Sequence, residues 1–222
     1  MIAGGPPIAI ADPDRRLALL HAPARARPGL AALWALDEAL ARLLVTTTQP
    51  LVGQMRLTWW HERLSKLAEG APAGEPVLGA LAAHVLPVGV LPAELAMVVE
   101  GWEELLEGGR LTPEALERHA RLRGGGLFGI AARLLGTEGD PVAVAGEGWA
   151  ATDLARHVRD ANERAAALQL AHGALAKALA PRWSRAGRPL GMLAVLAARG
   201  PDEAKDAPGR VWRALRFQLT GR

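Results

Sequence analysis

The chain contains no cysteine and no tyrosine, and it has only two phenylalanines. The absence of cysteine excludes disulfide bonds, thiolate zinc sites, iron–sulfur clusters and a cysteine nucleophile. Isoleucine and valine together make up 17 of the 222 residues, whereas alanine and leucine make up 81. Because valine, isoleucine, tyrosine and phenylalanine favour strands while alanine and leucine favour helices, the composition predicts an all-α protein.

Lysine is also scarce, since 23 of the 26 basic residues are arginine. The formal net charge is only +3. This excess is too small to indicate nucleic-acid binding, and we expect no nucleic-acid partner. The chain has no run of about 18 apolar residues, and its first residues lack the basic and apolar regions of a signal peptide. We therefore expect a cytoplasmic protein without a membrane-spanning helix.

Apolar residues recur at helical spacing between short segments rich in proline and glycine, and no repeat or long linker interrupts them. This pattern predicts a single helical domain over residues 1–222, built from about eight to ten helices. The predicted helices cover residues 13–21, 30–45, 50–69, 77–86, 92–107, 112–135, 142–180, 190–198 and 211–219.

A tryptophan pair lies in the predicted helix over residues 50–69, within the run GQMRLTWWHERL. Arg56, Trp60 and Arg63 are spaced i, i+4, i+7, so they share one helical face, and Trp59 points about 100° away from Trp60. One interpretation is an anion or lipid pocket with an aromatic wall. The other is a pair of packed tryptophans covered by arginine stems.

Three consecutive glycines interrupt a helical pattern in the run RLRGGGLFGIAARLLG, at residues 121–136. Each glycine in a helix interior costs about 1 kcal/mol relative to alanine, so another interaction must offset that cost. Either a second helix approaches closely, or a ligand does. We favour close helix packing, with a kinked helix lining a cavity as the functional alternative.

Asp153, His157 and Asp160 are spaced i, i+4, i+7 in the predicted helix over residues 142–180. Two carboxylates and an imidazole on one helical face could hold a divalent metal ion. Arg156 and Arg159 lie beside them, so a solvated, salt-bridged face is the alternative interpretation.

The tryptophan-pair run and the glycine run resemble two helices of the squalene/phytoene synthase family. Their order and spacing fit that family over residues 18–164. The resemblance implies the all-α isoprenoid-synthase fold. It also implies, for active members, head-to-head joining of two prenyl diphosphates, with Mg²⁺ held by two aspartate-rich motifs on facing helices.

The first aspartate-rich motif of that family is absent here. When Trp34 is aligned with the aromatic residue that precedes the motif, the aspartate positions fall on Ala41, Arg42 and Val45. None of these side chains binds Mg²⁺. The adjacent carboxylates at 37–38 lie one turn too early and point apart on a helix.

The second motif is half present. The Arg-Asp pair at 159–160 and the acidic Glu163 match the family pattern, but Arg164 replaces the final aspartate. In the family pattern a glutamine and an asparagine precede this motif, and their positions fall on Asp153 and Arg156 here. An arginine can pair with a phosphate but does not supply the Lewis acidity of Mg²⁺.

These departures resemble the aspartate-poor branch of the family that includes the mitochondrial complex I assembly factor. We therefore predict a non-catalytic prenyl-lipid-binding or assembly protein with no cofactor. Its ligand would be a prenyl diphosphate or isoprenoid lipid, and a protein partner and peripheral membrane contact are further expectations. The predicted ligand-binding residues are Arg56, Trp59, Trp60, Arg123, Gly125, Gly126, Phe128, Arg156 and Arg159.

Two alternatives remain open at this point. One is an active prenyltransferase that uses Mg²⁺ at a rebuilt metal site formed by Asp153, His157 and Asp160. The other is a helical interaction module that binds no ligand, in which the tryptophan-pair helix and the glycine helix only pack.

Overall fold

The computed structural model describes residues 8–47, 49–72, 74–106 and 111–222. Every regular element in these ranges is helical, and they contain no strand, which confirms the predicted all-α fold. The elements are α1 (Pro13–His21), α2 (Arg27–Thr46), α3 (Pro50–Ser65), η1 (Leu67–Glu69), α4 (Pro76–His84), η2 (Leu86–Val88), α5 (Pro92–Glu103), α6 (Pro113–His119), η3 (Ala120–Gly125), α7 (Gly126–Leu135), α8 (Val142–His157), α9 (Ala161–Leu179), α10 (Arg188–Ala197) and α11 (Arg210–Thr220).

Helix boundaries follow local capping signals that the sequence carries. Asp12 accepts hydrogen bonds from the backbone N–H groups of Asp14 and Arg15, which starts α1 with a proline in its first turn. Thr112 caps α6 in the same way. Gly136, with φ of +69°, ends α7 in the left-handed conformation that glycine adopts without strain.

The glycine helix is one continuous helix made of α6, η3 and α7. Its middle segment, η3, is a π-helix, in which each turn holds an additional residue. When these three segments are counted as one, the described residues contain ten α-helices, which agrees with the predicted eight to ten.

The predicted long helix over residues 142–180 is in fact two helices, and this expectation is corrected. Helix α8 ends at His157, and Val158 and Asp160 have extended backbone. The side chain of Asp160 accepts hydrogen bonds from the N–H groups of Asn162 and Glu163, so it caps a new helix instead of continuing the previous one.

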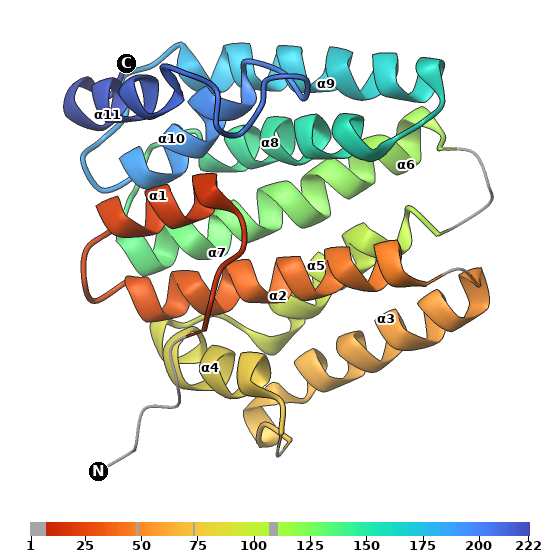
Figure 1. Ribbon diagram of the computed structural model, residues 1–222. Helices are drawn as coiled ribbons and strands as arrows, with labels where there is room; N and C mark the ends of the chain where they lie inside the picture. The colour runs from red at the N-terminus through yellow and green to blue at the C-terminus, as the bar shows by residue number, and fades with distance from the viewer. Residues whose placement is uncertain (1–7, 48, 73, 107–110) are drawn as a thin grey trace.

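Helix α8 occupies the middle of the bundle, between α9 on one side and the glycine helix on the other (Figure 1). A β-carbon added at Gly124 would lie 2.1 Å from the carbonyl oxygen of Gly146 on α8. The two backbones therefore touch, and close helix packing explains this glycine, as expected from the sequence.

Helix α2 lies alongside the glycine helix in space. Helix α3 packs mainly on α5, at the lower right of Figure 1. Three aromatic side chains fill the centre of the core: Phe128 lies edge-on to Trp34 with ring centroids 6.1 Å apart, and 5.5 Å from Trp149. Among the described residues, no helix combines the length and the apolar character needed to cross a membrane.

Candidate functional site

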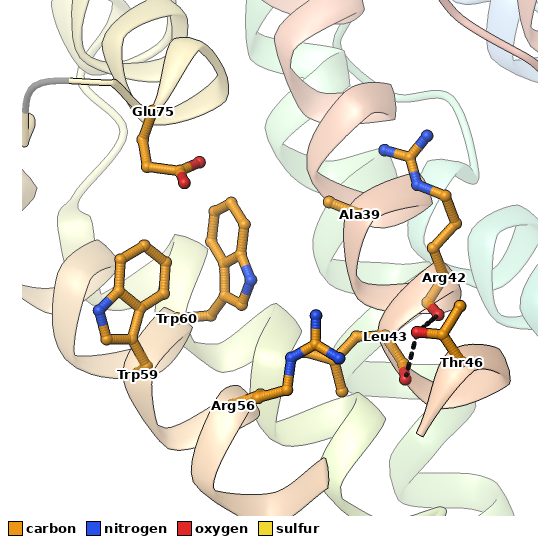
Figure 2. A pocket seen from close by; sticks show the side chains of 8 residues that line it. All are labelled: Ala39, Arg42, Leu43, Thr46, Arg56, Trp59, Trp60 and Glu75. Carbon is orange, nitrogen blue, oxygen red and sulfur yellow. Dashed lines mark hydrogen bonds between the residues drawn. The ribbon is translucent and has the colours of Figure 1, made fainter. Parts of the chain in front are cut away.

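A pocket of about 440 Å³ opens between the end of α2 and the tryptophan-pair helix α3. We call it the α2–α3 pocket (Figure 2). It is lined by Ala39, Arg42, Leu43, Thr46, Arg56, Trp59, Trp60 and Glu75. Its volume lies in the range of about 300–1,000 Å³ that is usual for small-molecule sites.

The α2–α3 pocket combines an aromatic wall with an excess of positive charge. The rings of Trp59 and Trp60 meet edge-to-face at 5.3 Å, and Figure 2 shows the Trp60 indole standing between the helices. The Arg56 guanidinium reaches across toward α2, where it donates a hydrogen bond to the Thr47 hydroxyl at 3.2 Å. Arg42 adds a second guanidinium from α2, so the pocket suits an anionic group attached to an apolar body.

A second polar cluster, the central ion network, lies buried between α1, α2, the glycine helix and α8. Asp37 accepts from Arg15 at 2.5 Å and from both Nε and Nη2 of Arg123, at 2.8 and 2.9 Å. The same Nη2 of Arg123 donates to Asp153 on α8 at 2.7 Å. The Trp102 indole N–H completes the shell of Asp37 at 3.1 Å.

Electrostatics keep this network ionised. Burial alone would raise the pKa of Asp37, but the charges of Arg123 and Arg15 outweigh it and lower that pKa. The pKa of Asp153 is lowered in the same way, since burial is again outweighed by Arg123. Burial would lower the pKa of Arg123, whereas the two carboxylates raise it, so its guanidinium remains charged.

Helix α2 and helix α8 are therefore joined by one fixed cation. The Arg123 guanidinium also lies 4.0 Å from the ring centroid of Trp102 and 4.9 Å from that of Trp149. These cation–π contacts surround the parts of the guanidinium that the carboxylates leave uncovered. The central ion network therefore holds α2, the glycine helix and α8 together at the centre of the bundle.

His119 lies against this network and is held neutral. Its Nδ1 lies 2.6 Å from the carbonyl oxygen of Gly101, and because a carbonyl only accepts, Nδ1 carries the proton. The buried Nε2 has no hydrogen-bond partner among the described residues. Burial, and after it the charge of Arg123, lowers the pKa of His119 to about 4.

We expect this histidine to make the fold acid-sensitive. The folded state holds the pKa of His119 at about 4, whereas an unperturbed histidine has a pKa of 6.5, so its contribution to stability is complete above pH 6.5 and falls as the pH drops toward 4. The free energy of unfolding, measured with urea, should fall by about 2 kcal/mol between about pH 7 and about pH 5. Carboxylates, with ordinary pKa values of about 4, contribute little in this window.

His119→Asn tests the assignment, because its amide can still donate to the Gly101 carbonyl. The variant should lose most of the fall in stability between the two pH values, and the same exchange at the exposed His172 on α9 is the matched control. An unchanged pH dependence in His119→Asn would show that another group is responsible.

The structure brings together only part of the predicted ligand site. Arg56, Trp59 and Trp60 line the α2–α3 pocket, but Arg123 and Phe128 do not, because both are buried in the centre of the bundle. The expectation that these two residues belong to the same ligand-binding site as the tryptophan pair is corrected.

The remaining predicted residues lie elsewhere. Gly125 and Gly126 are half-buried, and their nearest neighbours are on α8 and at Val98 of α5. Arg156 lines a small polar cleft of about 30 Å³ beside Asp153, and Arg159 is exposed in the turn between α8 and α9.

The three predicted metal ligands do not share a helical face. Asp153 is committed to Arg123, the ring of His157 bonds the backbone carbonyl of Asp153 at 2.8 Å, and Asp160 belongs to the cap of α9. In the described ranges, no three side chains of the histidine, aspartate and glutamate type are grouped so that they could hold a metal ion.

The comparison with protein families agrees with the helical architecture and the two signature helices. The squalene/phytoene synthase family model matches residues 9–212. The chain belongs to this family. The comparisons with curated proteins and with solved structures found no match.

The family's Mg²⁺ chemistry can be tested against the side chains present at its aspartate positions. Arg42 faces the α2–α3 pocket, and Val45 is 79% exposed at the end of α2. At the second motif, Glu163 accepts the N–H of Leu111 at 2.9 Å and Arg164 pairs with Asp202 at 2.6 Å. These groups do not fit a pair of Mg²⁺ sites, because carboxylates are missing from the motif positions on α2 and the acidic side chain of the second motif is engaged elsewhere.

In this member of the squalene/phytoene synthase family, the site predicted from the sequence did not include Asp37, Arg15 or Arg42, although Asp37 and Arg42 were noted beside the first motif. Asp37 has a detectable signal, since it lies among Leu33, Leu36 and Leu40 on the apolar stripe of α2. A carboxylate on a buried face needs a cationic partner. The identity of that partner comes from tertiary structure, because Arg123 is 86 residues away.

Proposed function

We propose that this protein binds a prenyl chain with an anionic headgroup and does not transfer it. The headgroup would lie between Arg42 and Arg56, and the chain would lie along the indoles of Trp59 and Trp60. The observation that carries the proposal is Arg42: it occupies a position of the first aspartate-rich motif and lines the same pocket as the tryptophan pair.

Charge supports a binding role. Two guanidiniums can hold a diphosphate through paired, charge-assisted hydrogen bonds, as carboxylate-bound Mg²⁺ holds it in active relatives. Glu75, the one acidic side chain in the lining, leaves the pocket with a net positive charge. Guanidiniums bind the headgroup but give its departure less assistance than Mg²⁺ does.

The central ion network supports the same conclusion. In active relatives the two motif helices are bridged by metal ions, whereas here Arg123 bridges carboxylates of α2 and α8 directly. An assembly role with a protein partner is compatible with a lipid-binding site, because a partner bound elsewhere on the surface would leave the α2–α3 pocket free for the lipid.

The test is binding of farnesyl diphosphate by isothermal titration calorimetry without Mg²⁺. Arg42→Gln and Arg56→Gln should each weaken binding by at least about tenfold, because each removes a charge-assisted contact of roughly 1.5–3 kcal/mol. Trp60→Ala should weaken it through loss of apolar contact. Arg121→Gln, an exposed arginine outside the pocket, is the matched control and should bind as the wild type does.

Product analysis after incubation with Mg²⁺ separates the alternatives. Release of diphosphate with formation of a joined prenyl product would overturn the binding proposal in favour of a transferase. Absence of binding, or equal binding by Arg42→Gln and the wild type, would favour an interaction module without this ligand.

A further inference from the structure

Helix α11 carries large apolar side chains on its outer side. Val211, Trp212 and Leu219 are 55%, 76% and 78% exposed, and Trp212 and Leu219 are seven residues apart, on one face. A single exposed apolar residue is ordinary, whereas neighbouring exposed apolar residues that adjoin a cluster of like charges are a candidate interaction surface. Trp212 is the most exposed of the seven tryptophans.

These side chains cannot turn inward, because the opposite face of α11 is fixed in the core. Phe217 packs edge-on to Trp183 with ring centroids 6.1 Å apart, and it leaves no room for a β-carbon at Gly191 on α10. Arg188 donates to the carbonyls of Gln218 and Leu219, which anchors the end of the helix.

The C-terminal end of this face carries exposed positive charge, whereas Asp14 and Glu203 pair with Arg210 at its N-terminal end. Residues 207–222 and residues 180–200 contain no aspartate or glutamate. The second segment is joined to the end of α11 by a hydrogen bond from Arg182 to the Thr220 carbonyl at 2.9 Å. Four exposed arginines therefore belong to this end of the molecule: Arg182, Arg185, Arg216 and Arg222.

The apolar surface continues from α11 onto α1. A hollow of about 230 Å³ is lined by Leu17 and Leu20 of α1 and by Val211 of α11, and its lining also includes the charged side chains of Asp14, Arg16, Lys205 and Arg210. Leu20 is itself 67% exposed. Together with the four arginines, these side chains form what we call the α11 surface: Leu20, Val211, Trp212, Leu219, Arg182, Arg185, Arg216 and Arg222.

We infer that the α11 surface docks onto a lipid bilayer that carries anionic headgroups. Tryptophan and leucine enter the boundary between headgroups and acyl chains, while arginines beside them pair with lipid phosphates. A nucleic acid would satisfy the arginines but not Leu219, Val211 and Leu20. The surface lies at the opposite corner of the bundle from α3, so this inference is independent of the α2–α3 pocket (Figure 1).

The experiment measures co-sedimentation of the full chain with vesicles of phosphatidylcholine, with and without phosphatidylglycerol. We expect binding to the anionic vesicles that weakens at high salt. Trp212→Ser with Leu219→Ser should reduce the partition coefficient at least tenfold, and Arg216→Gln should reduce it about fivefold. A blue shift of tryptophan emission on vesicle addition should disappear in Trp212→Phe.

The matched control is Leu51→Ser with Met55→Ser on α3, whose side chains are 69% and 66% exposed. It should bind vesicles as the wild type does. Absence of vesicle binding would overturn the inference and leave the surface to a protein partner. Equal loss in the α3 control, or no loss in the α11 variants, would also overturn it. Circular dichroism of each variant checks that the helices remain folded.

Discussion

Replacing Asp37 with alanine is expected to lower the free energy of unfolding by about 3–5 kcal/mol, because it leaves two buried guanidiniums without their shared carboxylate. Arg15 and Arg123 both donate to Asp37, and the side chain of Asp37 is fully buried. After the replacement, Arg123 still pairs with Asp153 on α8, but its bonds to α2 are lost. The Trp102 indole N–H also loses its acceptor.

Urea unfolding followed by circular dichroism measures this effect. Asp37→Asn separates charge from shape, since an amide retains one acceptor but not the negative charge, and it should be nearly as destabilising. Glu62→Ala, an exposed carboxylate on α3, is the matched control and should change stability by less than about 0.5 kcal/mol. A loss below about 1 kcal/mol in Asp37→Ala would mean that the network contributes little to stability.

Gly124→Ala is expected to cost at least about 3 kcal/mol, at or above the upper end of the usual range for overpacking. Its β-carbon would lie 2.1 Å from the Gly146 carbonyl oxygen and 2.7 Å from the Ala150 methyl group. The nearest atoms are backbone, which cannot rotate away, so α8 and the glycine helix must separate. That separation removes apolar contacts along both helices.

Gly129→Ala, in the same helix, provides a control of opposite sign. No atom lies within 4 Å of a β-carbon added at Gly129. The usual advantage of alanine over glycine in a helix, up to about 1 kcal/mol, should then appear as stabilisation. Thermal or urea unfolding of both variants gives the comparison, and a similar stability of the two would contradict direct backbone contact at Gly124.

Local signals in the sequence were sufficient for most helix boundaries. Asp12 before Pro13, Thr112 before Pro113 and Gly136 after Leu135 all cap helices where the sequence pattern places them. The exception was the single helix predicted over residues 142–180. Apolar spacing continues through that region, but the local hydrogen bonds of Asp160 compete with the helix and stop it.

The candidate site was predictable only where one helix supplies its residues. Arg56 and Trp60 lie one turn apart on α3, so helical spacing was enough to place them in one pocket. Arg123 and Phe128 lie on the glycine helix and are buried in the centre of the bundle, and spacing along one helix does not show which neighbouring helix its residues meet. The pairing of Arg123 with Asp37 depends on tertiary contacts that no local pattern contains.

The Arg123 bridge also determines which parts of the molecule can move apart. Separating α2 from α8 would pull a guanidinium away from two carboxylates in a low-dielectric interior, so these helices behave as one rigid body. Among the described residues no ion pair joins α3 to α2; Arg56 of α3 donates to Thr47 at the end of α2, and α3 packs mainly on α5. A ligand larger than the α2–α3 pocket would therefore be admitted by displacement of α3 at the edge of the bundle. Helices α2 and α8 would keep their positions.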